Sequence, residues 1–147
     1  MRLSTKGRYA VMAMTDLALH GRERAVSLAE IAARQEISLS YLEQLFARLR
    51  RDGLVRSVRG PGGGYRLASA ADATPIAAIV RAVDEPIRAT RCAQPTKGCM
   101  KGGEKCLTHD LWESLSREIE VYLARITLDD VLNGRLKVGA ETRIEAA

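Results

Sequence analysis

The chain has 147 residues, of which 46% are hydrophobic and 28% are charged, so it is long enough to bury one modest core. This balance predicts a globular protein rather than a disordered one, and the sequence contains no run of about 18 apolar residues that would indicate a membrane span. The formal net charge of +5 favours an anionic partner such as nucleic acid, although an excess of this size predicts only nonspecific attraction.

The first third of the chain predicts three helices. Ser4 is a candidate N-cap for a helix that runs to about His20. The segment Ser27-Leu-Ala-Glu30 matches a capping box and opens a helix of about two turns. A second box, Ser40-Tyr-Leu-Glu43, opens a third helix, and two capped helices so close together indicate a helix-turn-helix. The apolar residues of the third helix share one face: Leu42, Leu45, Phe46 and Leu49.

The polar residues of this third helix are candidates for contact with DNA. Recognition helices contact bases from their first turns, serine hydroxyls bind phosphate, and glutamine offers the paired donor and acceptor that fit adenine. On this reasoning the candidate DNA contacts are Ser38, Ser40, Tyr41, Gln44, Arg48 and Arg51. A merely polar outer face, which every surface helix has, is the alternative interpretation.

A glycine-rich turn follows the third helix. Leu54–Arg59 and Tyr65–Leu67 predict two short strands joined by the turn Gly60-Pro-Gly-Gly-Gly64. This pattern is typical of the wing of a winged helix, with Arg59 at its tip, where a guanidinium can enter a minor groove or bind phosphate. A nucleotide phosphate loop is disfavoured, because the Gly-Lys-Ser/Thr ending and the helix that must follow it are missing.

Two further helices are predicted in the second half of the chain. Thr74 and Pro75 start the first, with Pro75 at the first helical position, and Pro86 ends it. The second starts near Leu107, with Thr108 as the candidate N-cap. Its apolar residues are spaced three and four apart, which is typical of a coiled-coil seam and predicts dimerisation; packing on the chain's own core is the alternative. The predicted seam consists of Trp112, Leu115, Ile119, Tyr122 and Ile126.

All three cysteines lie between these two helices, at Cys92, Cys99 and Cys106, and His109 follows the last. Three thiolates and one imidazole form a complete ligand set for an iron–sulfur cluster or for zinc, although the six-residue gaps fit zinc poorly. A disulfide framework is disfavoured, because the number of cysteines is odd and no secretory signal is recognised, so a cytoplasmic, reducing compartment is expected. Three ordinary thiols remain possible, but a loop rich in Gly and Lys offers them little core.

Four stretches together resemble the IscR-type iron–sulfur cluster regulators: Met1–Val11, Ile37–Phe46, Val58–Tyr65 and Cys106-Leu-Thr-His109. The resemblance covers about residues 1–133 and implies a homodimeric winged helix-turn-helix repressor or activator that binds a double-stranded DNA operator. It implies a [2Fe-2S] cluster, supplied by the iron–sulfur assembly machinery, and control of the cluster-assembly genes. The cluster ligands that it implies are Cys92, Cys99, Cys106 and His109, and the DNA contacts are Ser40, Glu43, Gln44 and Arg59.

The cysteine spacing departs from this family pattern. Members of the family usually have five residues between successive cysteines, whereas this chain has six in both gaps. An extra residue in a loop costs little closure entropy, so ligation is expected to survive with altered exposure and lability of the cluster. A nitric-oxide- or iron-responsive regulator of the same family and a constitutive zinc-stapled DNA-binding protein are the alternatives. An enzyme is not expected, since no substrate-site residues are recognised.

The predicted fold is therefore mainly α with a small β-hairpin wing. We expect a winged helix-turn-helix DNA-binding domain at residues 1–85, a cluster-binding loop at 86–106, a dimerisation helix region at 107–133 and a disordered tail at 134–147. Thr127–Leu132 predicts one or two further helical turns. Glu43 has two predicted roles, either in the capping box or as a carboxylate beside the DNA groove that makes the cluster-bound and cluster-free forms prefer different operators.

Overall fold

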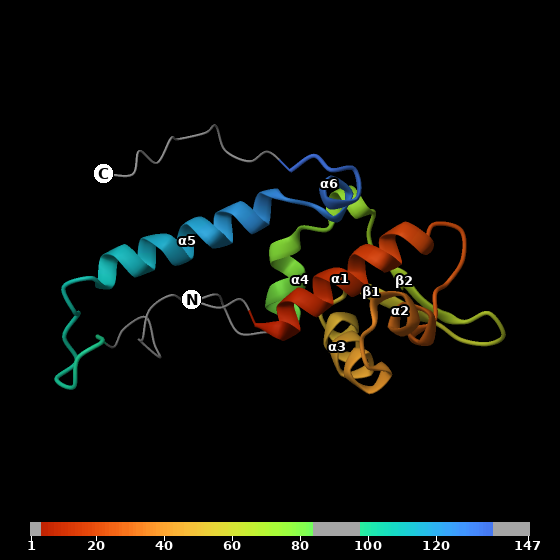
Figure 1. The fold of residues 1–147 in the computed structure, drawn as a ribbon, viewed down its shortest axis with the longest axis horizontal. Helices are drawn as coiled ribbons and strands as arrows, with labels where there is room; N and C mark the ends of the chain where they lie inside the picture. Colours follow the sequence, from red (N-terminus) through yellow and green to blue (C-terminus); the bar gives the residue numbers. More distant parts are fainter. Residues whose placement is uncertain (1–3, 84–97, 137–147) are drawn as a thin grey trace.

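The structure is a computed structural model that describes residues 4–83 and 98–136. A mainly helical chain with one antiparallel hairpin confirms the predicted fold class. Figure 1 shows α5 extending from one end of the compact part and the hairpin projecting from the other. In chain order the elements are α1 (Thr5–His20), α2 (Leu28–Gln35), α3 (Leu39–Arg51), β1 (Val55–Val58), β2 (Gly64–Leu67), the 3-10 helix η1 (Ala71–Ala73), α4 (Ile76–Val83), α5 (His109–Arg125) and α6 (Leu128–Leu132).

Helix α1 forms the centre of the core and contacts α2, α3, α4, α6 and β2. Ala10 and Ala13 are fully buried, and their small side chains allow neighbouring helices to approach closely. Phe46 of α3 is also fully buried, and its ring packs on Tyr65 of β2 with the ring centroids 5.0 Å apart. This aromatic contact fixes the position of the third helix relative to the hairpin.

The caps of the first two helices form as the sequence predicts. The Ser4 hydroxyl accepts a hydrogen bond from the Gly7 N–H at 3.2 Å. At the start of α2, Ser27 and Glu30 exchange both bonds of a capping box. The pKa of Glu30 is lowered to about 2, first because Arg24 donates to its carboxylate and also because the Ser27 backbone N–H does.

The cap of α3 differs from the prediction. Ser38, rather than Ser40, is the N-cap, and its hydroxyl accepts from the Tyr41 N–H at 3.1 Å. The preceding chain explains the shift, because Glu36 adopts a left-handed φ of 55° and Ile37 is buried, which directs Ser38 to the helix start. The predicted capping-box role of Glu43 is therefore wrong.

An ion pair between the buried carboxylate of Asp16 and the partly exposed guanidinium of Arg34 joins α1 to α2. Asp16 is 3% exposed, and its carboxylate accepts hydrogen bonds from Arg34 Nη2 at 2.7 Å, from Arg34 Nε at 3.0 Å and from Gln35 Nε2 at 2.8 Å. Burial raises the pKa of Asp16, but these bonds and the Arg34 charge outweigh burial, so the pKa lies below its usual value. The carboxylate is thus ionised and paired inside the helix-turn-helix.

The hairpin confirms the predicted wing strands, with Val55 opposite Leu67 and Val58 opposite Gly64. Its turn closes through the Gly63 N–H and the Gly60 carbonyl at 2.9 Å, with Pro61 second and Gly62 third at a φ of 71°, as a type II turn requires.

The base of the hairpin also pairs with the segment before α2. Val26 and Tyr65 exchange two backbone hydrogen bonds, of 3.0 and 2.7 Å. A Cβ atom at Gly64 would lie 2.3 Å from the Val26 carbonyl oxygen, so only glycine allows this approach. The hairpin is therefore anchored to the helix-turn-helix by backbone contacts.

The start of α4 also differs from the prediction, since Pro75 lies before the helix and forms a β-bridge with Thr127. The Ile76 N–H donates to the Ile126 carbonyl at 2.8 Å, and the Leu128 N–H donates to the Thr74 carbonyl at 3.1 Å. These bonds hold the chain in an extended conformation at this position, which keeps Pro75 out of the helix. The predicted end of α4 at Pro86 lies outside the described residues.

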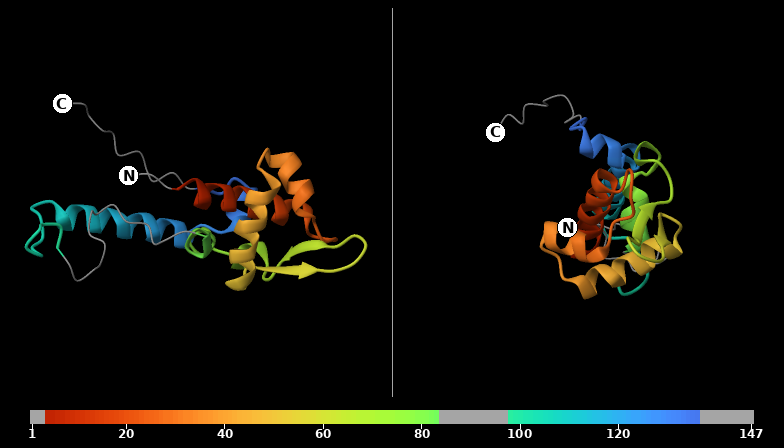
Figure 2. Two further views of the ribbon diagram at one scale, coloured as in Figure 1. Left: turned by 90° about the horizontal axis from the view of Figure 1, so that it is seen from below. Right: turned by 90° about the vertical axis from the view of Figure 1, so that its right-hand side faces the viewer.

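The chain returns to this core after α5. Helix α6 contacts α1 and η1, whereas α5 contacts α4 and then extends away from the core, as Figure 2 shows. Leu128 is fully buried, and the Thr127 and Asp130 capping box opens α6, which confirms the predicted turns at Thr127–Leu132. Helix α5 ends at Arg125, just before this capping box. Ile126, the last residue of the predicted seam, therefore lies one residue beyond the helix. Within the described residues, no helix has the length and apolarity needed to span a membrane.

Candidate DNA interface and candidate metal centre

The exposed side of α3 carries most of the predicted DNA contacts. Glu43 and Gln44 are exposed, as are Ser38 and Ser40, whose hydroxyl oxygens lie 3.1 Å apart at the helix N-terminus. A helix N-terminus favours phosphate, and the first turns of a recognition helix contact bases. The structure thus brings hydroxyl, carboxylate and amide groups onto one exposed surface.

Three other predicted contacts have partners inside the protein. The Tyr41 ring is half-buried and packs edge to face on Tyr9, with centroids 5.9 Å apart. Arg48 Nη1 donates to the Val83 carbonyl at the end of α4, at 2.9 Å. Arg51 is exposed, with its Nε 3.9 Å from a carboxylate oxygen of Asp52. Their contact with DNA stays a prediction, and Arg48 has a structural bond as well.

The hairpin carries two exposed arginines in addition to the predicted Arg59. Arg59 lies at the turn and is exposed, as predicted. Arg56 and Arg66 are also exposed and lie directly opposite each other on the two strands. In β1 only Val55 is buried, and Arg56, Ser57 and Val58 are all exposed, so no alternation of apolar and polar residues marks these arginines in the sequence. Three guanidinium groups therefore line the wing.

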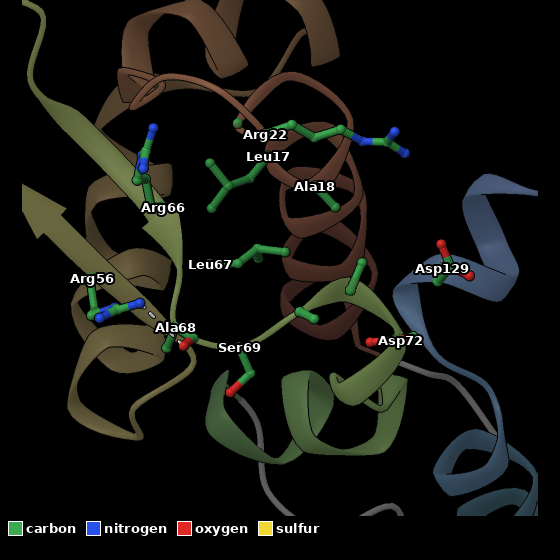
Figure 3. Close-up of a pocket in the computed structure, with 13 residues that line it drawn as sticks. Leu17, Ala18, Arg22, Arg56, Arg66, Leu67, Ala68, Ser69, Asp72 and Asp129 are labelled. Carbon is green, nitrogen blue, oxygen red and sulfur yellow. Dashed lines mark hydrogen bonds between the residues drawn. The ribbon is translucent and has the colours of Figure 1, made fainter.

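A hollow of about 590 Å³ lies between the hairpin, the end of α1, η1 and α6. Figure 3 shows Arg56 and Arg66 on one side of it and Asp72 and Asp129 on the other, with the guanidinium of Arg22 on the side of the aspartates. Arg66 Nη2 donates to the Glu23 carbonyl at 2.6 Å, and Arg56 Nη2 donates to the Ala68 carbonyl at 3.4 Å. Two of these arginines therefore brace the base of the wing.

The candidate metal centre lies at the start of α5, far from the wing (Figure 1). Cys99 Sγ is 3.0 Å from His109 Nδ1, and His109 is only 6% exposed. Cys106 is half-buried, and its carbonyl accepts from the His109 N–H at 3.1 Å, in the turn that opens the helix. Cys92, the fourth predicted ligand, lies outside the described residues.

The loop before α5 folds back tightly on itself. The Met100 N–H donates to the Glu104 carbonyl at 3.0 Å, and the Gly103 N–H donates to the Met100 carbonyl at 3.0 Å. A Cβ atom at Gly98 would lie 2.1 Å from the Glu104 carbonyl oxygen, so this approach requires glycine. The turn places a sulfur donor beside the imidazole, and soft sulfur with imidazole nitrogen fits an iron–sulfur cluster or zinc.

The N-terminus of α5 has a further feature that the sequence did not predict. Thr108 occupies the N-cap position without a capping bond, and its hydroxyl instead accepts from Trp112 Nε1 at 3.1 Å. His109 also lies close to two acidic residues, Asp110 and Glu113, and the possible ligand atoms of the three lie within 4.8 Å of one another. Both carboxylates are exposed and lie on the outer side of the imidazole.

Helix α5 exposes much of its apolar surface. Trp112 and Tyr122 of the predicted seam are 41% and 45% exposed, and Leu115 and Ile119 are half-buried. Leu111 and Val121 add exposed apolar area. Ile126 instead packs against the core of the winged helix. Dimerisation through this helix stays a prediction, supported by a surface that a monomer leaves in water.

Comparison with known proteins gives a family match along most of the chain. Residues 3–134 match the model of the Rrf2 family, which is described as an iron-dependent transcriptional regulator. The HTH-type transcriptional regulator IscR of Erwinia tasmaniensis is 59% identical over 135 residues, covering 92% of this chain and 81% of that protein. The protein of the same name from Pectobacterium carotovorum is 54% identical, covering 99% of this chain and 88% of that protein.

Solved structures agree with this match. T. potens IscR superposes with a TM-score of 0.74 at 39% identity, covering 97% of this chain and 93% of that one. CymR, the global cysteine regulator of B. subtilis, superposes with a TM-score of 0.76 at 34% identity, covering 91% and 98%. Both similarities cover more than nine tenths of each chain.

Proposed function

The chain belongs to the Rrf2 family of transcriptional regulators, and on that premise we propose that it is a homodimeric DNA-binding regulator that senses iron–sulfur cluster status. A [2Fe-2S] cluster supplied by the assembly machinery is held by Cys92, Cys99, Cys106 and His109. The regulated genes are those of iron–sulfur cluster assembly. Family and relatives are transcriptional regulators, so the chain is not an enzyme.

The observation that carries this proposal is the contact between Cys99 and His109. A thiol sulfur in the loop and an imidazole nitrogen at the start of α5 lie 3.0 Å apart, and the imidazole is buried. Buried polar groups are held where they have partners, and this pair has the donor chemistry of a cluster. A bound cluster would supply a redox-active group that is lost when cluster supply falls.

Basic side chains of the loop suit such a ligand set. Three thiolates with a two-iron core leave a net negative charge, which cations nearby stabilise. Lys101 and Lys105 lie within this loop, and both are exposed. The positive end of the α5 dipole, at His109, acts in the same direction.

Two contacts join α4, which precedes the cysteine segment, to the recognition helix and to α5. Arg48 of α3 donates to the carbonyl of Val83, the last residue of α4 and the last described residue before the cysteine segment. Arg81 of α4 pairs with Glu120 of α5, with Nε 3.0 Å from Oε1. Cluster binding between α4 and α5 would therefore reach α3 through α4. The spacing of the two recognition helices in a dimer decides which half-sites fit.

The proposal is tested by purifying the protein without oxygen and measuring its visible absorption and its iron, sulfide and zinc content. We expect a coloured protein with about two iron and two sulfide ions per chain. The variant His109→Ala should change the absorption and lose cluster faster, because one ligand is removed. The chain has two histidines, and His20→Ala, at an exposed position of α1, is the matched control.

A colourless protein with one zinc ion per chain would contradict the sensor and leave a zinc-stapled DNA-binding protein. Equally stable clusters in the wild type and His109→Ala would instead exclude His109 as a ligand. Either result leaves the DNA-binding half of the proposal intact, because that half rests on α3 and the wing.

The DNA interface gives a second prediction. Arg59→Ala should weaken binding to all DNA sequences and reduce the slope of log affinity against log salt by about 1, because one phosphate contact is lost.

Glu43→Ala should change the ranking of operators, because a carboxylate beside the groove is repelled by phosphate unless a particular base accommodates it. Titration of labelled duplexes at several salt concentrations measures both effects.

Arg117→Ala is the control for the loss of charge, since Arg117 is an exposed arginine of α5, outside the helix-turn-helix and the wing. Equal weakening by Arg59→Ala and Arg117→Ala would show a nonspecific charge effect and exclude the wing contact. If Glu43→Ala leaves the operator preferences of both the cluster-bound and cluster-free forms unchanged, Glu43 has no part in selectivity.

A further inference from the structure

The imidazole of His109 lies between two different partners. On one side Nδ1 is 3.0 Å from Cys99 Sγ, and on the other Nε2 is 3.6 Å from a carboxylate oxygen of Glu113. The His109 side chain is 7% exposed and that of Glu113 is 49% exposed. The ring therefore faces sulfur on its buried side and a carboxylate toward the surface.

We propose that Glu113 positions His109 by holding the proton on Nε2, so that Nδ1 is the nitrogen that binds the cluster. A neutral imidazole carries one N–H and one lone pair, and only the lone pair can bind a metal. An ionised carboxylate can only accept a hydrogen bond, so beside Nε2 it favours the tautomer with the proton there. Glu113 is thus a positioning residue. This inference rests on the proposed cluster-binding function and specifies its ligand atom.

The helix supplies the geometry for this pairing. Residues four apart lie on the same face of an α-helix, and the first turn of α5 places Glu113 over His109. The distance of 3.6 Å is longer than a hydrogen bond, but Glu113 has a long, half-exposed side chain that can close it by a small rotation. Glu113 is near enough to orient the ring while staying outside the ligand set.

The neighbouring carboxylate of Asp110 is not equivalent. Asp110 is exposed and lies 3.5 Å from the ammonium of Lys105, with its side chain 87% exposed. It therefore faces the basic loop and the solvent. Among the described residues near His109, Glu113 is the one whose oxygen is paired with Nε2.

The expected effect follows from the general behaviour of metal-binding histidines. Their second nitrogen is almost always hydrogen-bonded to a carboxylate, a carbonyl or water, and loss of that partner weakens metal binding by about 10–100-fold. Without Glu113 the imidazole can adopt the other tautomer, in which Nδ1 carries the proton and cannot bind iron. The tautomer with the proton on Nδ1 would then compete with cluster binding.

The experiment compares the wild type with Glu113→Ala, Glu113→Gln and the control Glu118→Ala. Glu118 is an exposed carboxylate of the same helix, about 13 Å further along its axis from His109. Each protein is loaded with cluster without oxygen, and the decay of visible absorption is followed after a chelator is added. In the cluster-free proteins, the side-chain ¹⁵N shifts of His109 report the tautomer without any cluster.

Glu113→Ala should lose its cluster about ten times faster than the wild type, with the Nδ1–H tautomer populated in the cluster-free protein. Glu113→Gln should stay close to the wild type, because its amide oxygen still accepts from Nε2–H, and Glu118→Ala should be unchanged. Glu113→Ala should fold normally, since the position is half-exposed and alanine favours helix.

Equal decay rates for Glu113→Ala and Glu118→Ala, in a wild type that does hold a cluster, would overturn this inference and leave the proposed function standing. An Nδ1–H tautomer in the cluster-free wild type would overturn it as well. A wild type that takes up no iron would overturn the proposed function and this inference together.

Discussion

Replacing Arg34 with alanine is expected to destabilise the protein by about 3 kcal/mol, the lower end of the cost of leaving a buried charge unpaired. The reason is that the Asp16 side chain is 1% exposed and would keep only Gln35 as a partner. Asp16→Ala should cost less, because the Arg34 side chain is 30% exposed and can turn toward water. Chemical denaturation of the wild type, Arg34→Ala and Asp16→Ala measures their free energies of unfolding.

The effect of Arg34→Ala should depend on pH. In the wild type the pKa of Asp16 is lowered in the folded state, so its contribution to stability is present above the unfolded pKa and is lost as pH falls through the folded value. Without Arg34, burial dominates and the folded pKa is raised. Protonation of Asp16 at acid pH then removes the unpaired buried charge from Arg34→Ala. The difference in free energy of unfolding between this variant and the wild type should therefore narrow as pH falls.

Arg24→Ala is the control, since it removes an arginine from an exposed ion pair with Glu30 at the start of the same helix. Exposed pairs contribute little to stability, so its denaturation midpoint should lie near that of the wild type. A pH-independent gap for Arg34→Ala, or equal losses for Arg34→Ala and Arg24→Ala, would mean that the buried pair does not hold α1 and α2 together.

The double variant Trp112→Glu, Tyr122→Glu is expected to be a monomer and to bind an operator with two half-sites at least 100-fold more weakly than the wild type. Joining two binding modules raises overall affinity by about 10²–10⁴-fold, and that gain disappears when the modules separate. Both side chains are more than 40% exposed on α5, so the substitutions should leave the fold intact while placing charge in the proposed seam. Sedimentation equilibrium gives the mass and duplex titration the affinity.

Leu19→Glu is the matched control, because Leu19 is an apolar residue of α1 that is 53% exposed and lies outside α5. It makes the same kind of change without touching the proposed seam and should remain dimeric. A dimeric mass for the Trp112→Glu, Tyr122→Glu protein would exclude α5 as the main dimer contact. A monomeric wild type would exclude the dimer itself.

Features set by local chemistry could be predicted from the sequence. The capping box of Ser27 and Glu30 and the type II turn around Pro61 depend on residues a few positions apart, so their patterns determine their structure. The proximity of Cys99 and His109 also follows from a short loop rich in glycine.

Features set by distant contacts could not be predicted in this way. Pro75 fits the first turn of a helix, but pairing with Thr127 holds it in a bridge. The shift of the α3 cap to Ser38 depends on the backbone of Glu36, which the serine pattern does not reveal. The bond from Arg48 to Val83 joins residues far apart in sequence, so an arginine on a recognition helix gave no sign of it.

The position of Leu128 affects how the protein folds during synthesis. This residue is fully buried in the core that α1 and α4 begin, yet the cysteine loop and α5 precede it in the chain. Chains emerge from the ribosome N-terminus first, at about 5–20 residues per second. The core that supports α3 and the wing is therefore completed only after all three cysteines have been synthesised, although α3 and the wing themselves precede the cysteines in the chain.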